Sequence, residues 1–209
     1  MKRGSSIYSS GSKEIEIKVK LNELDKQLIL KWLSIHAKFI SRLKQTDYYL
    51  DNPHSSFVFL NQKGFRDANQ YFRVRSSENG ARLCYKKVHR DLDTEECLYC
   101  DEYEIEIHNV KQMLKILNAA GFTDVIEVSK ERSKYFYAPF EIVLDEVKNI
   151  GSFLEVELKS EVEDPKSGLD QLKEFLTKQI GIRELKQQSH GYATMALNPN
   201  RNFELPSRR

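Results

Sequence analysis

The segment from Glu14 to Lys20 reads E-I-E-I-K-V-K, and its strict alternation constrains the fold more than any other feature of the chain. Apolar residues occupy every second position, and charged residues occupy the positions between them. Successive side chains of a β-strand point to opposite faces, so the segment predicts a strand with one apolar and one charged face. Alone, this pattern is typical of an antiparallel sheet with one face in water.

The alternation recurs along the chain, and each time it groups charges of one sign. Four further pairs of like charge stand two residues apart: Arg73 with Arg75, Glu104 with Glu106, Lys130 with Arg132, and Glu155 with Glu157. Ordinary solvated strand faces mix signs, because like charges at neighbouring positions repel each other. We therefore expect a ligand that carries its own charge between these side chains.

The apolar patterns predict about eight strands and three main helices. The strands are expected near residues 14–20, 38–50, 70–76, 81–88, 102–108, 125–137, 141–147 and 153–160. Helices are expected at 22–36, from Asn109 to Gly121, and from the cap at Asp164 onward. Residues 51–69 and 89–101 are expected to be irregular or loops. Residues 1–12 and 198–209 are expected to be loose tails around one domain, 13–197.

The apolar strand faces match the apolar stripes of the helices, so we place the helices outside the sheet. The charged faces then point to the other side, and closure into a barrel leaves no strand edge unpaired. The expected fold class is α+β, a closed eight-stranded antiparallel β-barrel with helices packed outside. Its interior would hold the following charged residues: Lys18, Lys20, Arg73, Arg75, Arg82, Lys86, Lys130 and Arg132 as bases, and Glu14, Glu16, Glu104, Glu106, Asp145, Glu155 and Glu157 as acids.

Such an interior requires a charged ligand, because burying a charge without a partner costs several kcal/mol. Clustered Arg and Lys suit an extended polyanion, since the guanidinium fork matches phosphate oxygens. Clustered carboxylates without His or Cys favour a hard divalent cation, Mg²⁺ or Mn²⁺. A polyphosphate with its metal satisfies both clusters, and metal-assisted attack at phosphorus is the reaction class that follows.

The composition of the chain argues against several other classes of protein. The 33 bases and 31 acids give a net charge of only +2, whereas a dedicated nucleic-acid binder shows a larger basic excess. No apolar run approaches the ~20 residues that span a membrane, and the N-terminus lacks the apolar core of a secretory signal. The 3 cysteines, an odd number, favour a reducing compartment, and we expect a cytoplasmic protein. Cys97 and Cys100 form a lone C-x-x-C, which leaves zinc or redox chemistry open.

The ordered landmarks resemble one family. The opening Glu14-x-Glu16-x-Lys18 is similar to the E-x-E-x-K signature of the CYTH superfamily, the triphosphate tunnel metalloenzymes. Later segments follow in the expected order: F-R-V-R at 72–75, Lys86, E-Y-E-I-E-I at 102–107, K-E-R at 130–132, V-L-D-E-V at 143–147 and G-S-F-L-E-V-E-L at 151–158. Within the superfamily, Q-T-D-Y-Y-L-D and V-S-K-E-R-S-K-Y look most like the class IV adenylate cyclase group.

The resemblance implies a tunnel that binds a triphosphate and a divalent metal, Mg²⁺ or Mn²⁺. The positions that match its metal-binding carboxylates are Glu14, Glu16, Asp145, Glu155 and Glu157. The positions that match its phosphate binders are Lys18, Arg73, Arg75, Lys86, Lys130 and Arg132, and the inward bases Lys20 and Arg82 are added to this set. Glu16 and Lys18 are the expected catalytic residues. Glu104 and Glu106 match a family acidic pair that orients the bases or touches a second metal.

Three functions follow from this resemblance. The first is an adenylate cyclase that converts ATP to cyclic AMP and pyrophosphate. The second is an inorganic or thiamine triphosphatase, in which water attacks the terminal phosphorus and Lys18 helps to activate it. The third is a non-catalytic triphosphate- or nucleotide-binding module, which the full set of matching carboxylates disfavours. We expect a nucleoside triphosphate or another triphosphate compound as partner, with neither nucleic acid nor membrane, and a homodimer is compatible with the group.

Overall fold

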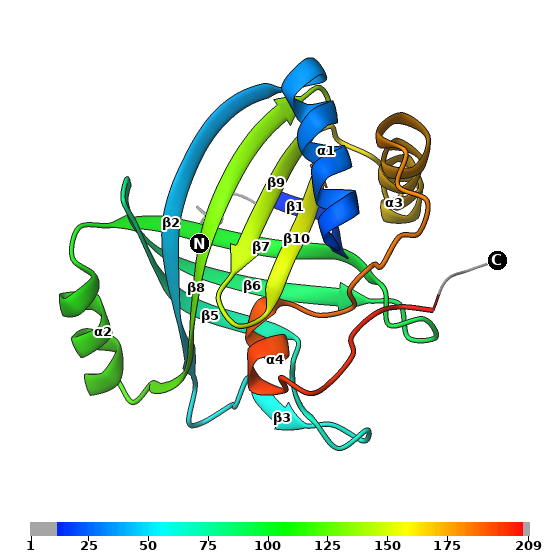
Figure 1. Cartoon of the computed structure of the whole chain (residues 1–209). Coiled ribbons are helices and arrows are strands. Elements are labelled where there is room, and N and C mark those ends of the chain that lie inside the picture. Colours follow the sequence, from blue (N-terminus) through cyan, green and yellow to red (C-terminus); the bar gives the residue numbers. More distant parts are fainter. Residues whose placement is uncertain (1–11, 207–209) are drawn as a thin grey trace, which may run out of the picture.

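Eight long strands close into one antiparallel barrel in the computed structural model, which describes residues 12–206 (Figure 1). Hydrogen-bonded neighbours follow the order β1-β10-β9-β8-β2-β5-β6-β7, and β7 pairs back with β1. The strands are β1 (Ser12–Lys20), β2 (Lys38–Asp51), β5 (Gln70–Ser77), β6 (Gly80–Arg90), β7 (Cys97–Ile107), β8 (Thr123–Tyr137), β9 (Phe140–Val147) and β10 (Gly151–Leu158). The expected fold class, a closed eight-stranded antiparallel barrel with helices outside, is confirmed.

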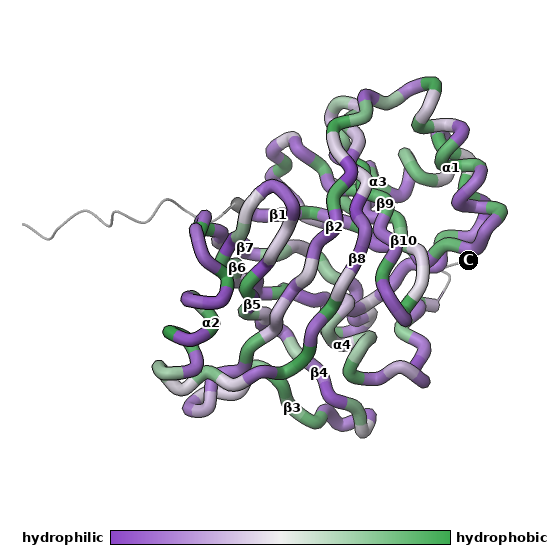
Figure 2. Tube along the Cα trace, turned by 60° about the vertical axis from the view of Figure 1, so that its left-hand side comes forward, coloured by the Kyte–Doolittle hydropathy of each residue, from purple (hydrophilic) through white to green (hydrophobic). Residues whose placement is uncertain are grey.

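The alternation in β1 explains why the charged faces lie inside the barrel. Ile15, Ile17 and Val19 are 6%, 1% and 1% exposed and belong to one apolar core outside the barrel wall. Because side chains alternate along a strand, the residues between them point inward. These residues line the barrel cavity: Glu14, Glu16 and Lys18. Figure 2 shows hydrophilic and hydrophobic residues alternating in short steps along the barrel strands.

Two helices cover the outer face of β1, β9 and β10 (Figure 1). α1 (Glu23–His36) begins at Asn22, whose side chain accepts a backbone hydrogen bond of 2.8 Å. α3 (Pro165–Glu174) begins at Asp164 and continues as a π-helix, η1 (Phe175–Ile180). Each large apolar side chain buried in this layer contributes roughly 1.5–3 kcal/mol. The apolar side of the wall is thus outside, where the helices cover it.

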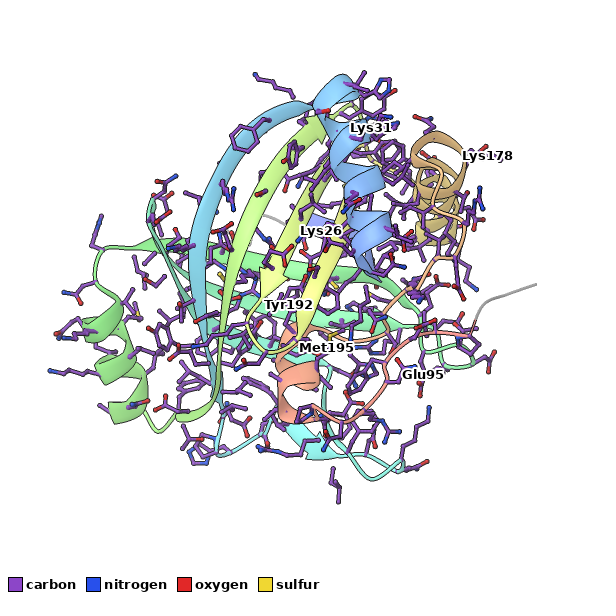
Figure 3. All side chains as sticks on the ribbon, in the orientation of Figure 1. Lys26, Lys31, Glu95, Lys178, Tyr192 and Met195 are labelled. Carbon is purple, nitrogen blue, oxygen red and sulfur yellow. The ribbon has the colours of Figure 1, made fainter. Side chains whose placement is uncertain are left out.

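Two further helices lie elsewhere on the barrel. α2 (Val110–Ala119) packs on the outer face of β5, on the side away from α1 and α3 (Figure 1). α4 (Tyr192–Leu197) lies at one end of the barrel, where its residues Tyr192 and Met195 are 4% and 6% exposed. Figure 3 labels these two side chains below the ends of β9 and β10. The apolar pattern of the sequence did not predict α4 as a helix.

The segment 51–69, expected to be irregular, contains a short hairpin. Its strands are β3 (Val58–Leu60) and β4 (Arg66–Ala68), which form a separate two-stranded sheet. The turn between them places Gly64 at a φ of +75°, a conformation that glycine adopts without strain. The hairpin lies beside α4 and helps to cover the same end of the barrel.

The expected loop 89–101 is shorter than predicted, because strand pairing continues into it. β6 runs to Arg90 and β7 begins at Cys97, with His89 paired to Tyr99 and Arg90 paired to Cys97. The polar composition of H-R-D-L-D-T-E-E suggested a loop, yet backbone pairing between neighbouring strands does not depend on apolar side chains. Only residues 91–96 lie between the two strands.

The expected tails differ in what the structure describes. Residues 1–11, most of the expected N-terminal tail, lie outside the described residues. Residues 198–206, expected to be loose, lie against the domain, and Phe203 is 6% exposed. The amide of Ser189 donates to the Phe203 carbonyl at 2.9 Å, and the amide of Leu205 donates to the Gln187 carbonyl at 2.8 Å. These hydrogen bonds hold residues 198–206 beside Gln187 and Ser189.

Within residues 12–206, no helix has the length and apolar character needed to cross a bilayer. The longest α-helix of this part, α1, has 14 residues and carries charged residues in its first turn. A membrane-spanning helix needs about 20 residues of apolar character.

Candidate active site

The barrel encloses a cavity of about 870 Å³ whose two ends differ in exposure. At one end the side chains of Arg82 and Glu106 are 51% and 82% exposed. At the other end His190 and Tyr192 are 5% and 4% exposed, and residues 187–192 lie across the barrel. We call the first end the mouth and the second the closed end. A ligand therefore enters at the mouth and reaches the closed end through the charged interior.

Charges of opposite sign occupy opposite sides of the cavity. The basic half-wall comes from β5, β6 and β8 and consists of Arg73, Arg75, Arg82, Lys86, Lys130 and Arg132. The acidic half-wall comes from β7, β1 and β10, which are neighbours in the barrel. It consists of Glu14, Glu16, Glu102, Glu104, Glu106, Glu155 and Glu157. Bases also stand beside the acidic half-wall: Lys18 on β1, Lys159 next to Glu157, and Lys86, whose side chain reaches over from β6.

Three carboxylates share one ammonium group in the acidic half-wall. The Nζ atom of Lys86 lies 2.9 Å from Glu14, 3.0 Å from Glu16 and 3.8 Å from Glu102. Burial raises the pKa of Glu14, and Lys86 opposes that shift. Burial also raises the pKa of Glu157, which faces Glu16 across the β1–β10 pair. This cluster has more carboxylates than cations, and additional positive charge would stabilise it.

A buried carboxylate organises the basic half-wall. Asp47 is 0% exposed and lies 2.7 Å from Arg75, 3.2 Å from Lys130 and 3.8 Å from Arg73. Burial alone would raise its pKa, but Lys130, Arg75 and Arg73 hold the pKa of Asp47 well below its usual range. Arg73 also lies 3.3 Å from Glu102 and Arg75 lies 3.8 Å from Glu104, so acids from the facing wall share these cations. Three clustered cations suit a polyanion.

Asp145, an expected metal ligand, is paired with Arg132 and Tyr192. It is 0% exposed, and its two oxygens accept from Arg132 at 2.8 and 2.5 Å. The hydroxyl of Tyr192 donates to one of these oxygens at 3.0 Å. Both oxygens are therefore engaged, and the carboxylate orients Arg132. Glu155, also expected to bind metal, is paired with Lys18 at 3.1 Å and with Arg132 at 2.5 Å.

Lys18 is a permanently charged group in this surrounding. Burial lowers the pKa of Lys18, but the charges of Glu155 and Glu16 overcome that effect and raise it above its ordinary value. Its Nζ atom also lies 4.4 Å from the centre of the Tyr192 ring, which favours the cation further. A lysine held in the protonated form stabilises negative charge and does not accept a proton.

Lys20 does not line the cavity, which corrects the expectation for this residue. Its side chain is exposed at the end of β1, and its backbone N–H donates to the carbonyl of Lys186 at 3.0 Å. The segment after Lys186 pairs with β1, because Gln188 donates to the Lys18 carbonyl at 2.8 Å. Alternation alone predicted an inward side chain, but this pairing separates the end of β1 from the cavity.

The acidic pair Glu104 and Glu106 lies at the mouth. Arg82 donates to Glu104 at 2.9 Å and lies 3.5 Å from Glu106, so these carboxylates orient a base. The thiol of Cys84 also donates to Glu104 at 3.0 Å. Arg75 lies 3.8 Å from the same carboxylate.

Several residues of the cavity region were not in the expected interior set, among them Glu102, Asp47 and Tyr192. Glu102 stands two residues before Glu104, so the strand alternation could have identified it. Asp47 lies on β2, whose inward residues Ser41, Leu43 and Gln45 carry no charge and obscure the pattern. Tyr192 lies on α4, outside the barrel strands, and no sequence period indicates it.

Cys97 and Cys100 both line the cavity, and their sulfur atoms lie 3.5 Å apart as free thiols. A register shift after His89 brings these residues, three apart in sequence, to the same face. Among the described residues no third His, Cys, Asp or Glu completes a metal cluster with them.

Comparison with known proteins agrees with the fold. A family model for the CYTH domain matches residues 12–192. Over 166 residues the chain is 27% identical to MJ0240 of Methanocaldococcus jannaschii, a protein provisionally named as an adenylate cyclase. That match covers 78% of this chain and 87% of the relative.

Two solved structures share the fold. The PH1819 protein of Pyrococcus horikoshii has a TM-score of 0.70 at 22% identity, with 90% of this chain and 99% of that chain covered. The HpAC1 protein of Hippeastrum, described as an adenylyl cyclase candidate with a dominant triphosphatase activity, has a TM-score of 0.57 at 17% identity. That match covers 88% of this chain and 93% of that chain. With the family match over most of its length, the chain belongs to the CYTH domain family, whose chemistry is carried out on triphosphates.

Proposed function

We propose that the barrel binds ATP together with a divalent cation and converts it to cyclic AMP and pyrophosphate. The observation that carries this proposal is the division of one cavity into a basic and an acidic half-wall. A triphosphate lying between them satisfies the basic half-wall, and its metal satisfies the acidic one. The name of the MJ0240 relative supports the cyclase reaction over other triphosphate chemistry.

The basic half-wall would hold the phosphate chain. The Nε atom of Arg73 is buried and has no hydrogen-bond partner among the described residues, so one charged donor is free for a phosphate oxygen. Arg75, Lys130 and Arg132 stand on the same side, with Asp47 and Asp145 fixing their positions. Positively charged donors that are already oriented stabilise the charge that develops on the departing pyrophosphate.

Among the described residues no three carboxylates already stand as a metal site. Glu14 and Glu16 are paired with Lys86 and Glu157 with Lys159, so these three carboxylates would exchange a lysine for a hard divalent cation. Glu14, Glu16 and Glu157 are oxygen donors on adjacent strands, and burial raises the pKa values of Glu14 and Glu157. Excess negative charge of this kind is what a bound Mg²⁺ or Mn²⁺ neutralises. A divalent cation held there would polarise the phosphate chain and lower the pKa of the attacking hydroxyl. Asp145 and Glu155 are engaged with Arg132 and orient it instead.

In the cyclase reaction, the ribose 3′ oxygen forms a bond to the α-phosphorus. The bond from that phosphorus to the bridging oxygen of pyrophosphate breaks, and the 3′ hydroxyl proton is released. Lys18 and Arg132 would stabilise the extra charge on the pyrophosphate, because both remain protonated in this surrounding.

A triphosphatase is the second candidate, in which water attacks the terminal phosphorus instead. The reported activity of the HpAC1 protein supports this alternative, since the two proteins share the fold. Lys18 is then a charge-stabilising group and not a base, because its pKa lies above the ordinary value despite its burial.

Incubation with candidate substrates separates these functions. We expect ATP with Mg²⁺ or Mn²⁺ to give cyclic AMP and pyrophosphate, measured by chromatography. Orthophosphate released from tripolyphosphate or thiamine triphosphate, without any cyclic AMP from ATP, would instead establish the triphosphatase. Binding without any product would identify a non-catalytic module.

Lys130 makes a pH-dependent contribution to triphosphate binding. Burial lowers its pKa to about 8, although Asp47 opposes the shift. A bound polyanion favours the protonated form, so above that pH a proton must be taken up on binding. We expect the affinity for ATP to fall by up to about tenfold per pH unit above pH 8, measured by calorimetry in EDTA.

The matched variant for this prediction is Lys130→Arg, whose guanidinium stays charged throughout the range. We expect its affinity to change far less between about pH 8 and about pH 9. Lys148→Arg, at an exposed position after β9, serves as the control. An equal pH dependence in the wild type and in Lys130→Arg would contradict this role.

A further inference from the structure

Three apolar side chains stand within the charged lining near the mouth of the cavity, and we call them the apolar strip. They are Ile40 and Leu43 on β2 and Val143 on β9, with Ile40 46% and Val143 4% exposed. The inward side chains of Lys134 and Arg132 on β8 lie between the two strands. Ile40 faces inward because the pairing of β2 with β8 shifts register between Phe39 and Ser41. Apolar side chains do not bind phosphate, so this strip indicates that the ligand also has an apolar surface.

A buried hydrogen-bond acceptor lies next to this strip. Gln45 stands two residues after Leu43 on the same inward face of β2. Its Oε1 atom is buried and has no hydrogen-bond partner within residues 12–206. Buried polar atoms are almost always paired, because an unpaired acceptor loses its hydration without compensation. The ligand therefore has an N–H or O–H donor that reaches this position.

Together these features describe a flat apolar group with a hydrogen-bonding edge. A purine ring has two apolar faces, and the amide of Gln matches the edge of adenine. Its oxygen accepts from the exocyclic amino group, and its nitrogen donates to N7. We infer that Ile40, Leu43, Val143 and Gln45 form a subsite for the adenine base. This inference rests on the proposed function, and it specifies ATP over inorganic triphosphate as the substrate.

The position of the subsite agrees with the direction of the cavity. Gln45 pairs with Ser77 of β5 and with Lys130 of β8, so it stands at the level of Lys130, and Leu43 and Ile40 lie nearer to the mouth. A nucleotide that enters with its phosphates first places them on Lys130 and Arg73 and leaves its base beside Leu43. An inorganic triphosphate occupies the deep part alone. The cavity volume of about 870 Å³ is within the range of about 300–1,000 Å³ for sites of drug-sized ligands.

The test compares the binding of three probes in EDTA, which prevents metal-dependent turnover. They are ATP, inosine triphosphate, which has an oxygen in place of the amino group, and tripolyphosphate. We expect the wild type to bind ATP about tenfold more tightly than inosine triphosphate, the effect of about one hydrogen bond. In Gln45→Ala this preference should disappear, and the ratio of ATP affinity to tripolyphosphate affinity should fall about tenfold. Leu43→Ala should lower the same ratio.

The outcomes separate the subsite from the proposed function. Ile105→Ala, on an exposed outward position of β7, is the control, and its ratio should equal that of the wild type. If ATP and tripolyphosphate both bind but the ratio is the same in wild type, Gln45→Ala and Leu43→Ala, the base subsite is wrong and the triphosphate site stands. If none of the three probes binds the wild type, either in EDTA or with Mg²⁺, the proposed function itself is wrong.

Discussion

Glu16→Gln is expected to lower turnover of ATP by about a thousandfold while the barrel stays folded. Glutamine keeps the shape of the side chain and removes its charge, which a divalent cation requires. Glu16 stands with Glu14 and Glu102 around Lys86, and removing one of three clustered carboxylates relieves repulsion. Loss of turnover therefore has to come from the missing ligand and not from unfolding.

Product formation and the melting temperature are measured together to separate these effects. Glu157→Gln should behave in the same way, since Glu157 faces Glu16 across the β1–β10 pair. Glu127→Gln, at an exposed position of β8, is the control and should leave both quantities unchanged. Wild-type turnover in Glu16→Gln at saturating Mg²⁺ would show that Glu16 is not a ligand.

Asp47→Asn is expected to lower the free energy of unfolding by about 3–5 kcal/mol at neutral pH, the usual cost of removing one partner from a buried ion pair. Arg75 lies 2.7 Å from this carboxylate and would keep its charge without it, whereas Lys130, at 3.2 Å, would lose the charge that opposes the lowering of its pKa by burial. Chemical denaturation measures the loss. Added tripolyphosphate should recover part of it, because the polyanion supplies negative charge to the same cations.

The pH dependence of this loss follows from the depressed pKa of Asp47. Burial would raise the pKa, but Lys130, Arg75 and Arg73 hold it well below the ordinary value in the folded state. The unfolded chain therefore binds the proton first as pH falls. The contribution of Asp47 is complete above the ordinary carboxyl pKa of about 3.9, and it is lost as pH falls toward the folded value.

The difference in stability between wild type and Asp47→Asn should therefore narrow below about pH 4. Asp124→Asn, at an exposed position of β8, is the control and should match the wild type throughout. A difference that stayed constant down to the lowest pH at which the protein folds would show that the effect arises from packing and not from charge.

Strand alternation predicted the barrel and most of its charged lining. In β1 the period of two placed Ile15, Ile17 and Val19 under the helices and left the charges between them facing inward. The same argument predicted the inward positions of Arg73, Arg75, Lys130 and the other strand residues. On β1, β9 and β10 it succeeds because one face of the strand is buried under the helices, and that requirement fixes the orientation of the residues on the strand.

Strand alternation did not predict the surroundings of a residue where another segment of the chain contacts it. Lys20 occupies a position of β1 that alternation assigns to the inside of the barrel. However, residues 186–188 pair with the end of β1 and separate Lys20 from the cavity. Tyr192 reaches the cavity from α4, and no periodicity connects that helix to the strands. Alternation also places Asp145 on the inside of the barrel. It does not show that Arg132 and Tyr192 donate hydrogen bonds to the oxygens of this carboxylate. Pairing of distant side chains is a property of the closed barrel and not of the local sequence.

Under the proposed function, the crossing of the barrel by residues 187–192 would also determine the order in which the products leave. Where this part of the chain closes one end, whatever is held deepest departs last. In the proposed orientation pyrophosphate lies deepest and cyclic AMP lies nearer to the mouth, so the nucleotide product is released first. Pyrophosphate should then act as a competitive product inhibitor against ATP, and cyclic AMP should act as a non-competitive one.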